Sequence, residues 1–335
     1  MLACVLCQAG AGIGLGHFSR ASRIATALEI QLHAIVQIYV LVPPQGENGL
    51  DHLSKAKLLS PLLPLRGQIF NDISVIDLFV IDVPPSQVSD ELNDCLFAAR
   101  TAGATIVSID NTDLSSSVDL VFLPTFRQPS TKPDIVQQAL LVYGWDCFLL
   151  DENTELIDWR PGQRVLALTG GSDATSLGSH WPALLDASLP STTQLEWVTG
   201  PFATPPRLPI CPRIKITEHL APSALRSLMQ GTNYAITVYG VSFFELLQLG
   251  IPTVVFSPYE ERDRAELNEI KRDRLAIVAR NEIDAIERLV GLMADQSLAA
   301  ELASLGPERL KYPGVNRLCK EIRLLRSHKR PDASN

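Results

Sequence analysis

The chain has 335 residues, of which 46% are hydrophobic and 20% charged, and its formal net charge is −8. This length suits two domains of ordinary size, and the composition is typical of a globular protein. The negative charge argues against nucleic acid as a partner and against an anionic membrane surface. No apolar run approaches the ~20 residues of a membrane span. The segment 1–10 also lacks the basic start of a signal peptide, so we expect a cytoplasmic protein without stable membrane insertion.

Cysteine usage indicates a reducing compartment. The six cysteines are scattered along the chain, which favours free thiols over a disulfide framework. Cys4 and Cys7 have the C-x-x-C spacing but fall in an apolar run that reads as a strand, where residues three apart point to opposite faces. No His/Cys cluster has zinc-site spacing, so we expect no metal and no cofactor.

The first half of the chain alternates strand-like and helix-like segments. Apolar periodicity predicts a helix after the glycine-rich segment 12–16 and another over 89–102, ended by Gly103. Predicted strands cover residues 2–7, 35–42, 78–82, 105–110 and 120–123. Alternation of this kind indicates a parallel sheet with helices on both faces.

The pattern restarts after a linker-like segment over 151–163. Predicted strands cover residues 164–169, 194–199, 214–216, 234–238 and 253–256, and predicted helices cover 181–187, 285–293 and 298–305. A basic amphipathic helix over 318–330 fades into a polar tail. We therefore predict an α/β protein with two Rossmann-like, doubly wound domains, over 1–155 and 156–315, that face an interdomain cleft. Residues 316–335 form the C-terminal helix and tail, and we expect a monomer.

The first candidate site is the glycine-rich segment that leads into His17. A strand, a glycine turn and a helix start together present backbone N–H groups and the helix dipole to an anion. His17 would then act as a base or as a donor to that anion. Asp82 and Asp110 end two other predicted strands, and the C-terminal strand ends of a parallel sheet share one edge, where ligands bind. The alternative is a tight turn with an exposed histidine.

Two polar residues close to Asp110 have a simpler interpretation. Asn111 and Asp113 follow the predicted strand and would orient His17 or a sugar. The alternative, which we favour, is a turn in which these side chains bond their own backbone.

The second candidate site is the segment 240–245. Gly240 and Ser242 close a predicted strand and open a helix, where free N–H groups and a hydroxyl can hold a phosphate. Glu245 lies one turn later, within reach of a ribose diol. The alternative is a capping box, because Ser242 and Glu245 have the S-x-x-E spacing.

Four motifs in this order resemble one known group of proteins. They are Gly14-Leu15-Gly16-His17 with Arg20, Tyr143-Gly144, Gly170-Gly171-Ser172-Asp173, and Gly240-x-Ser242-x-x-Glu245. The chain resembles the nucleotide-sugar enzymes of GT-B architecture over nearly its whole length. It is most similar to the UDP-2,4-diacetamido-2,4,6-trideoxy-β-L-altropyranose hydrolases of pseudaminic acid synthesis and their spore-coat polysaccharide relatives.

The resemblance implies a UDP-sugar hydrolase that releases UDP, with His17 as general base. It implies that the nucleotide is bound by Gly171, Ser172, Gly240, Val241, Ser242 and Glu245, and the rest of the substrate by Gly14, Gly16, Arg20, Asp82, Asp110 and Tyr143. A UDP-sugar or related nucleotide-sugar is the expected partner. The alternatives are a GT-B glycosyltransferase that uses an acceptor hydroxyl and a non-catalytic nucleotide-sugar binding protein.

The chain departs from that family at three places. Asp82-Val83-Pro84 stands where the family has Asp-x-Tyr, and Tyr239 replaces a glycine. The Asn-Gln pair expected after the strand at 253–256 is absent, and Glu-Glu-Arg-Asp-Arg occupies 260–264. Charges that alternate in sign indicate a solvated helix face there. The alternative is that Arg262 or Arg264 reaches a phosphate.

Overall fold

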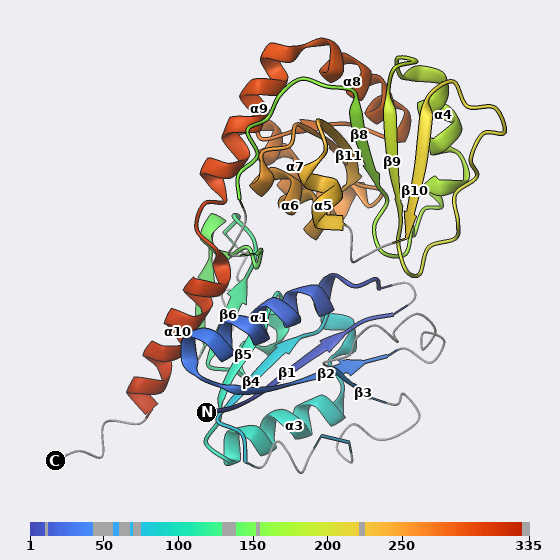
Figure 1. Ribbon diagram of the computed structural model, residues 1–335. Coiled ribbons are helices and arrows are strands. Elements are labelled where there is room, and N and C mark those ends of the chain that lie inside the picture. The colour runs from blue at the N-terminus through green and yellow to red at the C-terminus, as the bar shows by residue number, and fades with distance from the viewer. Residues whose placement is uncertain are drawn as a thin grey trace. The chain divides into compact units, whose positions relative to one another are not determined.

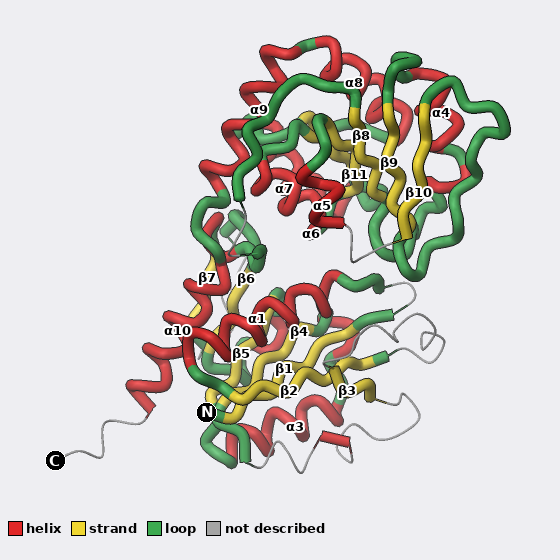
Figure 2. Tube along the Cα trace, viewed as in Figure 1, coloured by secondary structure: helices red, strands yellow, loops and turns green. Residues whose placement is uncertain are grey.

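The computed structural model describes residues 1–10, 13–42, 56–59, 68–69, 75–128, 139–151, 155–220 and 225–329. The chain divides into two compact units (Figures 1 and 2). The first unit joins Met1–Glu152 to Tyr312–Asn335, and the second is Asn153–Lys311. Each unit is built around one parallel sheet, so the predicted α/β class is confirmed.

The first unit contains a seven-stranded sheet in the order β3-β2-β1-β4-β5-β6-β7. Its strands are β1 (Leu2–Gln8), β2 (Ile35–Leu41), β3 (Ala56–Leu59), β4 (Leu78–Asp82), β5 (Thr105–Ile109), β6 (Leu120–Leu123) and β7 (Leu140–Tyr143). Five of them follow the predicted apolar runs. The two edge strands, β3 and β7, were not predicted, because they are short and largely solvent-facing and so carry no buried apolar run.

Helices cover both faces of this sheet (Figure 1). α3 (Asp90–Thr101) packs Leu92, Cys95 and Leu96 into the core beneath β1, β4 and β5. Ser89 caps α3 by accepting a hydrogen bond from the Leu92 N–H, as the predicted start of this helix requires. α1 (Gly16–Leu32) lies on the opposite face.

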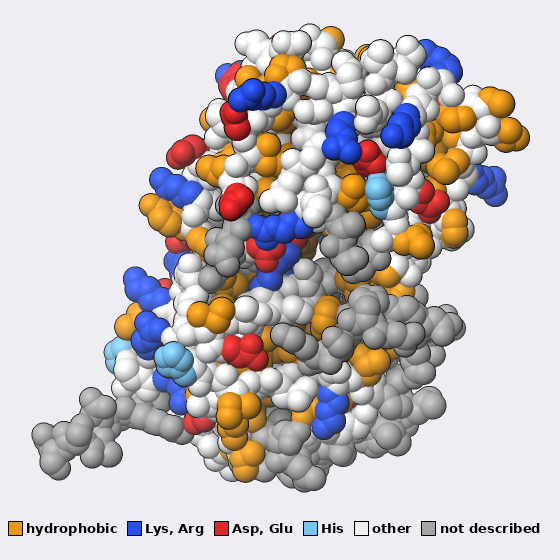
Figure 3. All heavy atoms as spheres, viewed as in Figure 1, with side chains coloured by type: hydrophobic (Ala, Val, Ile, Leu, Met, Phe, Trp, Pro, Cys, Tyr) orange, Lys and Arg blue, Asp and Glu red, His pale blue; other side chains and the backbone are white. Residues whose placement is uncertain are grey.

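The last helix, α10 (Gly314–Lys329), returns to the first unit after the chain has built the second. It buries Val315, Leu318, Cys319 and Ile322, and basic side chains lie over its outer surface (Figure 3). The predicted amphipathic helix is confirmed, although it begins four residues earlier than predicted, at Gly314. Residues 330–335, which hold the end of the predicted helix and the predicted tail, lie outside the described part. Of the described helices, none combines the length and apolarity that crossing a membrane requires.

The second unit contains a six-stranded sheet in the order β10-β9-β8-β11-β12-β13. Its strands are β8 (Arg164–Leu168), β9 (Gln194–Thr199), β10 (Lys215–Leu220), β11 (Tyr234–Val238), β12 (Thr253–Phe256) and β13 (Ile277–Val278). Its helices are α4 (Trp181–Ser188), α5 (Leu225–Gln230), α6 (Val241–Leu249), α7 (Glu260–Arg272), α8 (Glu282–Ala294) and α9 (Gln296–Arg309). β10 is longer than predicted, and the two-residue β13 was not predicted.

Both predicted sites lie at strand ends. Within each sheet all strands are parallel, so their C-terminal ends meet at one edge. In the first unit this edge carries the residues that follow β1, β4 and β5. In the second unit it carries those that follow β8, β11 and β12.

Candidate functional site

The turn before His17 is closed by two backbone hydrogen bonds. The Gly10 and Gly14 N–H groups each donate to the other's carbonyl, at 3.3 and 2.8 Å. Gly14 has φ +81°, a conformation that favours glycine. Gly12 lies outside the described residues. α1 starts at Gly16, and its N-cap residue, Leu15, provides no side-chain capping bond, which leaves the first backbone N–H groups of α1 available to an anion.

His17 and Arg20, one turn apart on α1, converge on Asp82 at the end of β4. His17 Nδ1 lies 2.7 Å from Asp82 Oδ1. Arg20 binds the same carboxylate through both oxygens, with Nη2 to Oδ1 at 2.7 Å and Nε to Oδ2 at 3.0 Å. The Asp82 side chain has no exposed surface, whereas His17 is 22% exposed. Histidine is therefore the member of this pair that solvent reaches.

The distances and charges of this cluster favour one direction for the histidine hydrogen bond. Burial by itself would raise the pKa of Asp82, but the Arg20 charge and the bond to His17 outweigh burial and hold this pKa below its usual value. Asp82 is thus a carboxylate that can only accept. Arg20 Nη2, which can only donate, lies 3.0 Å from the same His17 Nδ1. Because the Asp82 oxygen is nearer, at 2.7 Å, we assign the proton of the neutral imidazole to Nδ1. The lone pair of Nε2 is then available to take a proton.

Asp110 forms the outer end of the same network. Arg20 Nη1 donates to Asp110 Oδ2 at 2.9 Å, and the Asp110 side chain is 48% exposed. Its backbone is left-handed, with φ +60°, a conformation found mostly where the surrounding structure enforces it and often at functional sites. Arg20 itself is buried and held by two acids, which keep its pKa above the usual value despite burial.

The structure brings Arg20, Asp82 and Asp110 together in one network and places Tyr143 apart from it. Asp110 is exposed, whereas Asp82 and Arg20 are buried beneath His17 and contact each other. Tyr143 ends β7, three strands away from β4, which corresponds to about 14 Å along the sheet edge. The Asn111 side chain accepts a hydrogen bond from the Asp113 N–H at 3.0 Å, which confirms the predicted turn for Asn111.

In the second unit, the start of α6 lies at the C-terminal end of β11. Gly240 is the N-cap and Ser242 is the second helical residue. The capping-box alternative is therefore wrong, because its serine would have to be the N-cap. Glu245 is partly buried on the first turns of α6. A Cβ at Gly240 would meet no atom of the described residues within 4 Å, so the backbone there is open to close approach.

The loop over residues 170–172 lies beside that helix start. β8 and β11 are paired neighbours, so Gly171 and Ser172 share a sheet edge with Gly240 and Ser242. The next residue, Asp173, has a structural role. Its carboxylate accepts hydrogen bonds from the Leu177 and Gly178 N–H groups at 2.9 and 2.8 Å.

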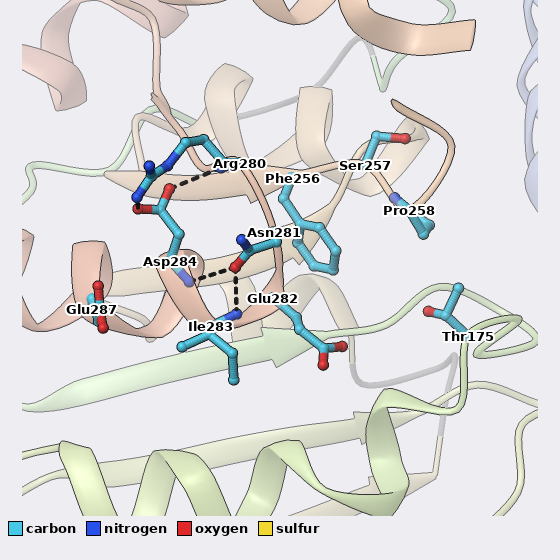
Figure 4. Close-up of a pocket in the computed structure, with 10 residues that line it drawn as sticks. All are labelled: Thr175, Phe256, Ser257, Pro258, Arg280, Asn281, Glu282, Ile283, Asp284 and Glu287. Atoms are coloured by element: carbon cyan, nitrogen blue, oxygen red, sulfur yellow. Dashed lines mark hydrogen bonds and ion pairs between the residues drawn. The ribbon is translucent and has the colours of Figure 1, made fainter. Parts of the chain in front are cut away.

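One hollow in this unit was not predicted from the sequence. It has a volume of about 670 Å³ and lies at the ends of β12 and β13, lined by Thr175, Glu287 and residues 256–258 and 280–284 (Figure 4). Asn281 caps α8 there by accepting from the Ile283 and Asp284 N–H groups, and Asp284 pairs with Arg280. This hollow includes none of the residues predicted to bind nucleotide.

No family model matches the sequence, and no curated protein matches it. Solved structures share its fold. MurG from Acinetobacter baumannii is 14% identical, with 96% of this chain and 99% of that chain covered and a TM-score of 0.62. UGT2 from Phytolacca americana, complexed with UDP-2-fluoro-glucose and pterostilbene, is 12% identical, with 97% and 98% covered and a TM-score of 0.64.

The calicheamicin glycosyltransferase CalG4 is a third match, 13% identical, with 99% of both chains covered and a TM-score of 0.56. At such identities the likeness establishes the fold alone. That fold is GT-B, with two Rossmann-like domains, and the fold predicted from the sequence is thereby confirmed.

Proposed function

We propose that this protein is an enzyme that cleaves a UDP-sugar between the nucleoside diphosphate and the sugar, with water as the acceptor. The observation that carries the proposal is the contact of 2.7 Å between His17 and the buried carboxylate of Asp82. A histidine oriented in this way has one nitrogen anchored and the other available, which is the arrangement that a general base needs.

In the proposed reaction, His17 Nε2 removes a proton from water as the water oxygen attacks C1 of the sugar. The new C1–O bond forms while the bond from C1 to the phosphate oxygen breaks, and UDP leaves with the electron pair. The imidazolium that results is stabilised by the Asp82 carboxylate on Nδ1. General-base help of this kind typically contributes ~10²–10⁴-fold to a rate.

The nucleotide is assigned to the second unit. Backbone N–H groups of Gly240, Val241 and Ser242 would bind the diphosphate, because they lie at the N-terminus of α6, where N–H groups have no partner within the helix. Gly171 and Ser172, on the neighbouring strand end, would add to this binding. Glu245 would accept hydrogen bonds from the ribose hydroxyls.

The substrate residues of the first unit have separate proposed roles. Gly14 and Gly16 would let the backbone approach the substrate, and Asp110 would bind sugar hydroxyls with the oxygen that Arg20 leaves available. Arg20 would act by positioning Asp110 and Asp82. Tyr143 would contact a more distant part of the substrate, since it lies on β7.

Transfer to an acceptor hydroxyl is the second candidate, and it fits the fold equally well. CalG4 is a glycosyltransferase, and the structure of UGT2 holds UDP-2-fluoro-glucose together with pterostilbene. His17 would serve that reaction equally, with an acceptor O–H in place of water. A protein that binds nucleotide-sugars without turning them over is the third candidate.

One experiment separates these candidates. The full chain is incubated with a panel of UDP-sugars without acceptor, in EDTA and in Mg²⁺, and free UDP is measured. Hydrolysis predicts UDP release that requires His17 and is equal in both buffers. Release only after acceptors are added would identify a transferase, and calorimetric binding without release in either case would identify a binding protein. Release that requires Mg²⁺ would contradict our expectation that no metal is needed.

A further inference from the structure

Arg262 is an exposed arginine whose guanidinium is held in place by its neighbours. Its Nε donates to Asp263 Oδ1 at 2.8 Å, and the guanidinium lies over the Tyr259 ring, 4.4 Å from the centroid. Asp263 is buried and accepts a hydrogen bond from the Ser257 hydroxyl at 2.5 Å. The same hydroxyl accepts from the Tyr259 N–H at 3.0 Å. Three residues, Ser257, Tyr259 and Asp263, thus fix the Arg262 guanidinium near the end of β12.

This cation lies at the same sheet edge as the start of α6. β11 and β12 are paired neighbours, and the Tyr239 N–H, just beyond β11, donates to the Phe256 carbonyl at 2.9 Å. Gly240, the N-cap of α6, follows Tyr239 directly, and α7, which carries Arg262, follows β12, so the two helix starts lie at the C-terminal ends of paired strands.

The ion pair with Asp263 uses only one side of the guanidinium. Nε and, at 3.4 Å, Nη2 face the Asp263 carboxylate. Nη1 has no hydrogen bond to any residue that the structure describes, and the side chain is 68% exposed. An ordinary surface ion pair contributes little to stability. Here, however, the buried carboxylate of Asp263 fixes the orientation of the exposed Arg262 side chain, so the remaining N–H donors of the guanidinium point in a set direction.

We propose that Arg262 binds the diphosphate of the nucleotide donor, an inference that rests on the proposed function. The planar guanidinium matches the geometry of phosphate oxygens and can bind two of them at once. Because stacking on Tyr259 and bonding to Asp263 already restrict the side chain, little conformational freedom is lost on binding. The contact would stabilise the charge that UDP carries as it leaves.

The test compares two charge-matched variants of the full chain. Arg262→Gln removes the proposed contact. Arg264→Gln removes the same charge from α7 two residues later, where the side chain is exposed and points about 200° away around the helix. Calorimetry measures the affinity of each protein for UDP and for uridine, which has no phosphate. We expect Arg262→Gln to weaken UDP binding by about tenfold or more, the size of a charge-assisted hydrogen bond, with uridine affinity unchanged.

Arg264→Gln is expected to keep UDP affinity within about twofold of the wild type. The Arg264 side chain points away from the proposed diphosphate site, so its charge is screened by solvent. Equal UDP affinities for the two variants would overturn the assignment of Arg262. A parallel loss of uridine and UDP affinity would also overturn it, because it would mean that Arg262 maintains the structure of the unit. If the wild-type protein does not bind UDP, the proposed function itself fails. UDP binding that is weakened by Glu245→Ala but not by Arg262→Gln would overturn this inference alone.

Discussion

Asp82 contacts His17 at 2.7 Å from a position with no solvent exposure at all. A carboxylate in this position acts on a substrate only through the groups that it binds. His17 receives its orientation from Asp82, and Arg20 balances the buried negative charge. The contact between Asp82 and His17 is therefore expected to affect the rate of the reaction, and the pairing of Asp82 with Arg20 is expected to affect the stability of the fold. The two effects are tested by different measurements.

The effect on the rate is tested by His17→Asn. Asparagine keeps a hydrogen-bond donor of similar size but cannot take up a proton. We expect the rate of UDP release to fall by at least about 100-fold, while UDP affinity stays within about tenfold, or ~1.4 kcal/mol. His328→Asn, on the exposed face of α10, is the matched control and should leave both quantities unchanged. Normal turnover with lost UDP binding would make His17 an anion anchor and not a base.

The effect on stability is tested by Asp82→Asn. This variant leaves the buried Arg20 without its main partner, so we expect the free energy of unfolding at pH 7 to fall by about 3 kcal/mol. Urea denaturation measures this change. Asp158→Asn, in a fully solvated ion pair with Arg160, should change stability by no more than about 0.5 kcal/mol. Similar small effects for the two variants would contradict the inferred charge balance.

The same pair predicts a pH dependence with a defined sign. The folded-state pKa of Asp82 lies below its ordinary value of about 3.9. Its contribution to stability is therefore fully present above about pH 4 and is lost as the pH falls through the folded-state pKa. The difference in unfolding free energy between the wild type and Asp82→Asn should shrink across that acidic range. A difference that stays constant down to acid unfolding would count against a depressed pKa.

The ribose role of Glu245 is tested by binding alone. Glu245→Ala should weaken UDP binding by about 1–3 kcal/mol, because charge-assisted hydrogen bonds to the ribose hydroxyls are lost. Glu308→Ala removes an acid of the same unit whose side chain is 78% exposed and serves as the control. Unchanged calorimetric affinity in a folded Glu245→Ala protein would remove the ribose from this site.

Two glycines of the second unit should respond to alanine in opposite directions. Gly250 ends α6 with φ +76°, and a Cβ there would lie 2.7 Å from the Ala303 carbonyl oxygen. Gly250→Ala should therefore lower the free energy of unfolding by more than about 1 kcal/mol. Gly291 is exposed within α8, and a Cβ there meets no described atom within 4 Å, so Gly291→Ala should raise that free energy by about 0.5–1 kcal/mol. Thermal or urea unfolding of both variants checks the contrast.

Local sequence patterns were sufficient to predict an element where the residues of that element alone carry the signal. The apolar runs at 78–82 and 234–238 coincide with β4 and β11, because a strand buried on both faces needs side chains of one kind throughout. The edge strands β3 and β7 and the two-residue β13 carry no such run. The sequence predicted the helix start at Gly240 because a glycine stands directly before an apolar helical pattern. The alternative, Ser242 as the N-cap, was excluded only by the observed first residue of α6, Val241.

The sequence by itself determined the alternation of strands and helices, the two glycine-rich helix starts and the placement of His17, Asp82 and Asp110 at strand ends. These features can be predicted because hydrophobic periodicity and glycine positions are patterns that span only a few residues. Only the tertiary structure decided that Arg20 bonds Asp82, 62 residues away, and Asp110, 90 residues away. Such contacts depend on the strand order β1-β4-β5. That order is set by how whole elements pack, which no local pattern records.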